Sequence, residues 1–146
     1  MTKKLISLEA YQEFVGDTTS LASSNPEEFI VRVNELERKE PEDNVNAVGV
    51  DLNRLLTAAI GLTAEGGEFA EVVKKIAFQG KPYNEQSRIH MIKEMGDVMW
   101  YIAQGCIALG TTIEEVVETN VEKLTARYPE GVFRVFHSEN RKEGDI

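Results

Sequence analysis

Apolar residues recur at intervals of three and four along most of this chain, which is the spacing of one face of an α-helix. Near the start, Ser7 is placed to cap a first helix with the apolar stripe Leu8, Tyr11 and Val15. Residues 18–25 predict a connection, and Asn25 followed by Pro26 predicts the cap and first residue of a second helix. The apolar stripe of that helix consists of Phe29, Ile30, Val33 and Leu36.

Three longer helices are predicted over residues 48–78, 84–109 and 112–128. Residues that stop a helix follow the end of each, at Gly80, Pro82, Gly110 and Pro129. Thr112 and Glu115 have the spacing of a capping box, in which both side chains accept hydrogen bonds from backbone N–H groups at the start of a helix. Strand signals are weak, because no sustained alternation of apolar and polar residues occurs. The sequence therefore predicts an all-α fold, arranged as a helical bundle.

The helix predicted over residues 84–109 is apolar nearly all round after Asp97, which is typical of a central, buried helix. The single cysteine of the chain, Cys106, lies in this apolar run and is predicted to be a small buried residue. Beyond the last long helix, residues 132–136 are expected to fold back, and the polar residues 137–146 to form a flexible tail.

Composition fits one globular domain and excludes several classes of function. The 146 residues, 42 % of them hydrophobic, suffice for one domain with a core and are too few for two ordinary domains. A net charge of −9 argues against binding a nucleic-acid polymer, which requires clustered Lys and Arg, but permits a small phosphorylated ligand bound with a divalent metal. Neither a signal peptide nor a membrane span of about 18 apolar residues is apparent, so a cytoplasmic protein with no membrane partner is expected.

Two short carboxylate pairs lie within otherwise apolar or small-residue stretches. They are Glu65-x-x-Glu68 and Glu94-x-x-Asp97, and members three positions apart are neighbours on one helix face. Carboxylates on a packing face are costly unless cations compensate them. Antiparallel packing of the two helices through the turn at residues 79–82 would bring the pairs together, and four carboxylates suit Mg²⁺, with Mn²⁺ as a substitute. The sequence therefore predicts a hard-cation site.

The same acidic pairs are also compatible with a role outside catalysis. The carboxylates could solvate the groove of a non-catalytic helical interaction module, whereas a ferritin-like oxidase is disfavoured because no histidine follows an acid by three positions. Gly66 and Gly67 could serve close helix packing or close approach of a ligand, and the sequence supports both roles equally. Basic and polar residues downstream are candidate phosphate contacts or solvated surface residues: Lys74, Lys75, Lys81, Asn120, Lys123 and Arg127.

Three segments carry a family resemblance. The first resembles a signature of the MazG-like nucleoside triphosphate pyrophosphohydrolases: Gly61-Leu62-x-x-Glu65-x-Gly67-Glu68-x-x-Glu71-x-x-Lys74-Lys75. The second resembles another signature of that family: Lys93-Glu94-x-Gly96-Asp97-Val98-x-Trp100-Tyr101. The third is similar to the next segment of short, single-domain members, many of them from phages: Asn120-x-x-Lys123-Leu124-x-x-Arg127-Tyr128-Pro129-x-Gly131-x-Phe133. The resemblance is specific from Gly61 onward.

The resemblance implies an all-α core of four helices, completed by a homodimer or homotetramer, in a single domain over residues 1–146. It implies Mg²⁺-dependent cleavage of the α–β phosphoanhydride of nucleoside triphosphates, giving a monophosphate and pyrophosphate. By the same resemblance, Mg²⁺ would be bound by Glu65, Glu68, Glu94 and Asp97.

It further implies phosphate contacts from Lys123 and Arg127, and ribose or base contacts from Asn120 and Tyr101. Glu68 and Glu94 are the expected catalytic carboxylates, with Glu68 as the acceptor of the proton of water. Residues 20–46 form an enlarged segment relative to shorter members, and we expect this segment to bear on base specificity.

Overall fold

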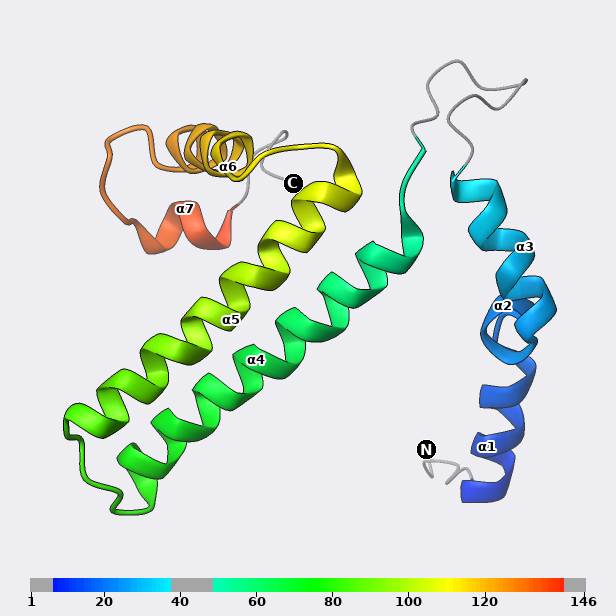
Figure 1. The fold of residues 1–146 in the computed structure, drawn as a ribbon, viewed down its shortest axis with the longest axis horizontal. Helices are drawn as coiled ribbons and strands as arrows, with labels where there is room; N and C mark the ends of the chain where they lie inside the picture. Colours follow the sequence, from blue (N-terminus) through cyan, green and yellow to red (C-terminus); the bar gives the residue numbers. More distant parts are fainter. Residues whose placement is uncertain (1–6, 38–48, 141–146) are drawn as a thin grey trace, which may run out of the picture. The chain divides into compact units, whose positions relative to one another are not determined.

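The structure is a computed structural model that describes residues 7–37 and 49–140. Within these two stretches it contains seven α-helices and no strand, which confirms the predicted all-α class (Figure 1). The chain divides into two compact units, residues 1–50 and 51–146. The single-domain organisation stays a prediction.

The first unit contains α1 (Leu8–Asp17), α2 (Leu21–Ser24) and α3 (Pro26–Glu37). The predicted caps of α1 and α3 are confirmed, because Ser7 Oγ accepts from the Ala10 N–H at 3.1 Å and Asn25 Oδ1 from the Glu27 N–H at 2.9 Å. The prediction of a plain connection over 18–25 is wrong, since the one-turn helix α2 forms there and packs on α3. Four residues are too few to show a helical period in the sequence.

Residues 20–37 of the expected enlarged segment thus form α2 and α3 with their caps, and residues 38–46 lie outside the described residues. Every side chain of α1 is exposed, and α3 has only Val33 and Leu36 partly covered. The Val50 N–H donates to the Leu36 carbonyl at 2.9 Å, which ties the end of this unit back to α3.

The second unit contains α4 (Leu52–Phe78), α5 (Glu85–Leu109), α6 (Ile113–Arg127) and α7 (Val135–Glu139). Helices α4 and α5 run antiparallel, side by side along their lengths, as a helical hairpin (Figure 1). Gly80 at φ 71° and Gly110 at φ 66° follow the two helices in the left-handed region, where a residue without Cβ is favoured. The predicted antiparallel arrangement is therefore present.

Helix starts in this unit follow local caps. Helix α4 begins at Leu52 and not near residue 48, because the Asp51 carboxylate accepts from the Arg54 N–H at 2.9 Å and caps the helix there. Thr112 caps α6 as predicted, and Asn84, the predicted first residue of the helix, is the N-cap of α5. The capping box at α6 forms in part: the Glu115 N–H donates to Thr112 Oγ1 at 3.1 Å, while the Glu115 carboxylate accepts from the Thr111 hydroxyl.

Small residues set the close contact between α4 and α5. Any Cβ on Gly61 would overlap the Tyr101 ring, so this ring lies directly against the α4 backbone. Nearby, Ala58 and Cys106 are buried, and the Arg54 guanidinium donates to Gln104 Oε1 at 2.6 Å across the hairpin. The core of the unit is this thin interface between two helices.

The prediction that α5 is a buried, central helix is wrong within one chain. Its buried residues are Ser87, Glu94, Cys106 and Ala108, whereas in the apolar run after Asp97 the Trp100 side chain is 54 % and Ile107 60 % exposed. The reason is that α4 covers one side of α5, and α6 meets α5 over a much smaller area. Cys106 itself is buried, as predicted.

The segment after α6 folds back as predicted. Gly131 at φ 69° turns the chain, the Phe133 and Tyr128 rings lie 5.7 Å apart, and α7 follows. The expected flexible tail at 137–146 begins inside α7, and its residues 141–146 lie outside the described residues. None of the described helices is long and apolar enough to cross a membrane.

Candidate metal centre

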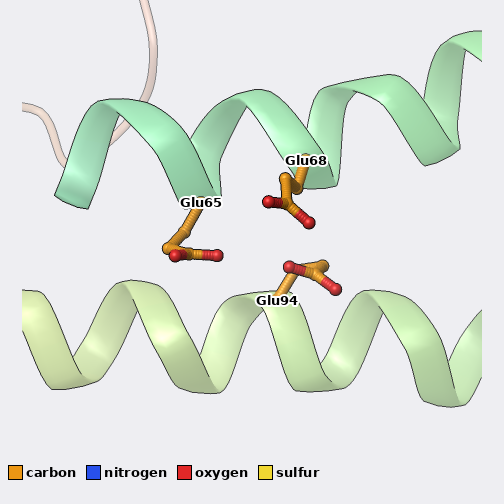
Figure 2. Close-up of side chains that lie close together, drawn as sticks. All are labelled: Glu65, Glu68 and Glu94. Carbon is orange, nitrogen blue, oxygen red and sulfur yellow. The ribbon is translucent and has the colours of Figure 1, made fainter. Parts of the chain in front are cut away.

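Three carboxylates meet across the α4–α5 hairpin. Glu65 and Glu68 lie one turn apart on α4 and face Glu94 on α5 (Figure 2). One oxygen of each carboxylate lies within 4.8 Å of the other two. The i, i+3 spacing on α4 places two acids on the face that contacts α5, so the antiparallel hairpin is sufficient to gather the group.

The three side chains differ in their exposure. Glu94 is buried, with 7 % of its surface exposed, Glu65 is half-buried and Glu68 is exposed. Desolvation raises the pKa of Glu65 above its ordinary value of 4.5, and the charges of Glu68, Asp97 and Glu94 raise it further. The group therefore holds mutually repelling negative charge, which a bound cation would relieve.

Asp97 lies outside this three-carboxylate group. Its side chain is exposed on α5, three residues after Glu94, although its charge is close enough to act on Glu65. The structure thus brings together three of the four carboxylates predicted as ligands and leaves the fourth at the edge.

His90 is a residue of this site that the sequence motifs did not indicate. Its imidazole Nε2 lies 2.9 Å from Glu94 Oε1, one helical turn before Glu94 on α5. The only available signal was the i, i+4 spacing of the two residues, which is common to many surface pairs. His90 also lines a recess at the α4–α5 turn, together with Lys81, Pro82, Asn84, Gln86 and Ser87.

The lysines predicted to contact phosphate lie in different settings. Lys81 shares the recess with His90, and Lys74 is exposed on α4 beyond the carboxylates. Lys75 Nζ is 2.8 Å from Glu71 Oε1, and this pairing, together with the charge of Lys74, lowers the pKa of Glu71. Lys75 is thus partly neutralised by its own helix.

Tyr101 lies in the hairpin interface. Its ring packs on Gly61 and meets the Trp100 ring edge to face, with centroids 4.8 Å apart. In the arrangement described, this side chain is engaged in helix packing.

The three candidates on α6 do not join the carboxylates. Glu94 and the end of α5 at Leu109 are separated by fifteen residues, roughly 22 Å of helix, and α6 starts beyond that end. In Figure 1, α6 is seen almost end-on, lies beside the upper end of α5 and does not run back along it. Asn120 and Lys123 are exposed and Arg127 is half-buried on this helix.

The glycine pair between the two α4 carboxylates has open surroundings. A Cβ built on Gly66 or Gly67 would meet nothing within 4 Å, so neither glycine serves helix packing within the described part of the chain. Of the two roles that the sequence permits, packing inside this hairpin is not observed. The strip of bare α4 backbone beside Glu65 and Glu68 is accessible to a ligand or to another chain.

Comparison with known proteins identifies the family. A family model described as the MazG nucleotide pyrophosphohydrolase domain matches residues 54–132, more than half of the 146 residues, including both carboxylate pairs. The Gene 37 protein of Mycobacterium phage L5 is 37 % identical over 76 residues, which cover 51 % of this chain and 67 % of that protein. No solved structure matches the chain. The match confirms the resemblance seen in the sequence motifs, and the chain belongs to the MazG nucleotide pyrophosphohydrolase domain family.

Proposed function

We propose that this protein is a divalent-metal-dependent hydrolase that cleaves the α–β phosphoanhydride of ribo- or deoxyribonucleoside triphosphates. The products would be the nucleoside monophosphate and pyrophosphate, an activity suited to control of the nucleotide pool. The observation that carries the proposal is the carboxylate group of Glu65, Glu68 and Glu94, with oxygens within 4.8 Å of one another, inside the region that matches the family.

The donor set fits a hard cation. Its ligands are carboxylate oxygens only, and its exposed side at Glu68 leaves room for water and phosphate oxygens, as Mg²⁺ or Mn²⁺ sites require. Glu65, Glu68 and Glu94 would hold the ion, and Asp97 would join them from the edge of the group. A bound divalent ion would neutralise phosphate charge and make a bound water more acidic.

The roles of fixed metal ligand, proton acceptor and phosphate contact would fall to different residues of the chain. Glu94 is buried, which suits a fixed ligand, whereas Glu68 is exposed and would accept the proton of the attacking water. Lys81 and Lys74 are available for phosphate oxygens, and Lys75 would reach them only by leaving Glu71. Asn120, Lys123 and Arg127 would complete the nucleotide site from a second copy of the chain, and Tyr101 would border it.

A pyrophosphate-release assay tests the proposal. The full chain is incubated with Mg²⁺ and each of the common ribo- and deoxyribonucleoside triphosphates, and the products are separated to distinguish pyrophosphate from inorganic phosphate. We expect pyrophosphate and monophosphate in equal amounts with at least one nucleotide. Release of inorganic phosphate alone would contradict α–β cleavage, and no release from any nucleotide would favour the non-catalytic interaction module.

The variant Glu94→Gln should strongly lower this turnover, because it removes a ligand charge from the buried position while keeping the side chain's shape. A loss of about two to three orders of magnitude in kcat is the expected scale for a lost electrostatic contact in an active site. Glu85→Gln is the matched control: this residue lies on the same helix and pairs with Arg88 at 2.9 Å on the surface. Circular dichroism should be unchanged in both variants, and substantial activity in Glu94→Gln would refute the assignment.

A further inference from the structure

We propose that the recess beside the α4–α5 turn binds pyrophosphate, with Lys81 and Lys93 contacting its oxygens. This inference rests on the proposed function, in which pyrophosphate is the leaving group, and it gives the substrate a direction on the hairpin. The triphosphate would run from the carboxylates toward the start of α5, with its β- and γ-phosphates in the recess.

Positive charge is concentrated in the part of the hairpin that contains the turn. Residues 72–93 contain five lysines and arginines and a single acid, although acids outnumber lysines and arginines by 25 to 16 in the whole chain. Two of the five, Lys75 and Arg88, form ion pairs with glutamates of their own helices at 2.8 Å and 2.9 Å. Lys81 and Lys93 form no ion pair with any described residue, so both remain available to an anion from outside the chain.

The two lysines line adjoining recesses. Lys81 borders a recess at the start of α5, and Lys93 borders a more open one further along this helix. Gln86 and His90 line both recesses, so the two adjoin. No acid is among the described residues that line them, which include amide, hydroxyl and ammonium groups. Such a lining suits an anion with many acceptor oxygens.

The recesses lead to the carboxylate group along one face of α5. The residues at i, i+4, i+7 and i+11 of this face are Gln86, His90, Lys93 and Asp97. His90 Nε2 lies 2.9 Å from Glu94 Oε1, so the recesses directly adjoin the carboxylates. A phosphate chain bound to a cation at the carboxylates can therefore extend along this face toward the turn.

In the opposite direction the hairpin offers no comparable cations. Helix α5 contains no Lys or Arg after Lys93, and α4 before Glu65 contains only Arg54. The Arg54 guanidinium pairs with Asp51 at 3.4 Å and donates to Gln104 at 2.6 Å. Within the hairpin, the charge of the β- and γ-phosphates is therefore stabilised best on the side of the turn.

Hydrogen bonds fix the backbone that carries Lys81. The Lys81 N–H donates to the Lys75 carbonyl on α4 at 3.1 Å. The Ser87 hydroxyl of α5, which is buried with 3 % exposed, donates to the Pro82 carbonyl at 3.0 Å. The turn is thus attached to both helices. Lys81 therefore starts from a defined position, which lowers the cost of ordering the site when an anion binds.

Binding of inorganic pyrophosphate to the full chain in the presence of Mg²⁺, measured by isothermal titration calorimetry, tests the inference. We expect the wild type to bind, and Lys81→Gln and Lys93→Gln each to bind about 10-fold more weakly, the scale of one lost hydrogen bond to a charged group. Lys81→Arg and Lys93→Arg keep the charge and should retain most of the affinity. Melting temperatures should be similar in all variants, because neither side chain is buried.

Arg88→Gln is the matched control, because Arg88 lies in the same basic stretch but lines neither recess. Its affinity for pyrophosphate should stay close to that of the wild type. An equal loss in Arg88→Gln would indicate diffuse attraction by the net charge of the stretch and would overturn the site. Unchanged affinity in either lysine variant, or no binding by the wild type, would also overturn it.

Product inhibition tests the direction of the substrate. For a nucleotide that the protein hydrolyses, Lys81→Gln and Lys93→Gln should raise the inhibition constant of pyrophosphate about 10-fold and leave that of the nucleoside monophosphate unchanged. An equal rise for both products would contradict the proposed direction.

The pyrophosphate-release assay distinguishes failure of this inference from failure of the proposed function. Release from a nucleotide, together with pyrophosphate affinity that neither lysine variant changes, would overturn the inference and leave the function intact. Lysine-dependent binding of pyrophosphate without release from any nucleotide would overturn the proposed function and retain the recess as an anion site.

Discussion

At the scale of single residues, Glu65 shows the effect of charge repulsion within the carboxylate group. Partial burial and three neighbouring carboxylates raise its pKa, so the folded state binds a proton there more tightly than the unfolded state does. The stability gained from this proton is fully present below the ordinary pKa of 4.5 and is lost as the pH rises through the raised value. At neutral pH the metal-free site is therefore under repulsion.

Glu65→Gln should raise the melting temperature of the metal-free protein at neutral pH, because it removes this repulsion. It should also flatten the fall in stability that occurs as the pH rises through the raised pKa of Glu65, measured in chelator by thermal unfolding. Glu71→Gln is a control of opposite sign: Lys75 lowers the pKa of Glu71, so its contribution is present above the ordinary pKa and is lost on acidification. A lower neutral-pH melting temperature in Glu65→Gln would contradict the assigned repulsion.

Gly61 and Tyr101 form a second residue-scale pair, in which the ring occupies the space of a missing Cβ. Gly61→Ala should destabilise the protein by about 1–3 kcal/mol, the usual cost of overpacking. Gly66→Ala is the matched control, since its Cβ meets nothing within 4 Å and alanine favours helix by up to about 1 kcal/mol. Urea unfolding should show a lower free energy of unfolding in Gly61→Ala and a higher one in Gly66→Ala. Equal changes in the two variants would contradict the close contact of Tyr101 with Gly61.

At the scale of elements, the sequence predicted the features that local chemistry determines. Caps at Ser7, Asn25 and Thr112 placed three helix starts, because each cap depends on hydrogen bonds to the next residues. The start of α4 is misplaced in the sequence prediction because Val48 lies four residues before Leu52 and so extends the apolar spacing beyond the cap, Asp51. One-turn helix α2 gave no periodic signal.

In the candidate site, too, the residues placed by local spacing were predictable from the sequence, and those placed by long-range packing were not. Glu65 and Glu68 were predictable as neighbours because i, i+3 spacing is local, and the turn at 79–82 implied that Glu94 would face them. The closeness of His90 to Glu94 was not predictable, since i, i+4 spacing alone does not determine which side chains meet. The place of Asn120, Lys123 and Arg127 depends on packing between helices or chains, which periodicity does not determine.

At the scale of the whole molecule, the second unit exposes an apolar stripe that its own described helices leave uncovered. Ile92, Met95 and Met99 follow i, i+3, i+7 on α5 and are 50 %, 57 % and 47 % exposed. Water-exposed apolar stripes of this kind typically mark an interface. The periodicity of α5 predicted burial of this stripe, which the described helices of the second unit do not provide.

We therefore expect a homodimer or homotetramer in sedimentation velocity at micromolar concentration. Met95→Glu should shift the protein to smaller species, because it places a charge within the stripe. Gln86→Glu adds the same charge at an exposed polar position of the same helix and should leave the assembly unchanged. A wild-type monomer would show that the stripe is not an interface between copies of this chain.

The glycine pair in α4 has one more consequence. Each glycine weakens the helix by about 1 kcal/mol relative to alanine, so the turn between Glu65 and Glu68 is intrinsically the weakest of α4. The two carboxylates lie on either side of it. A cation bound by both carboxylates would bridge this turn. Metal binding would therefore also make the middle of the hairpin more rigid.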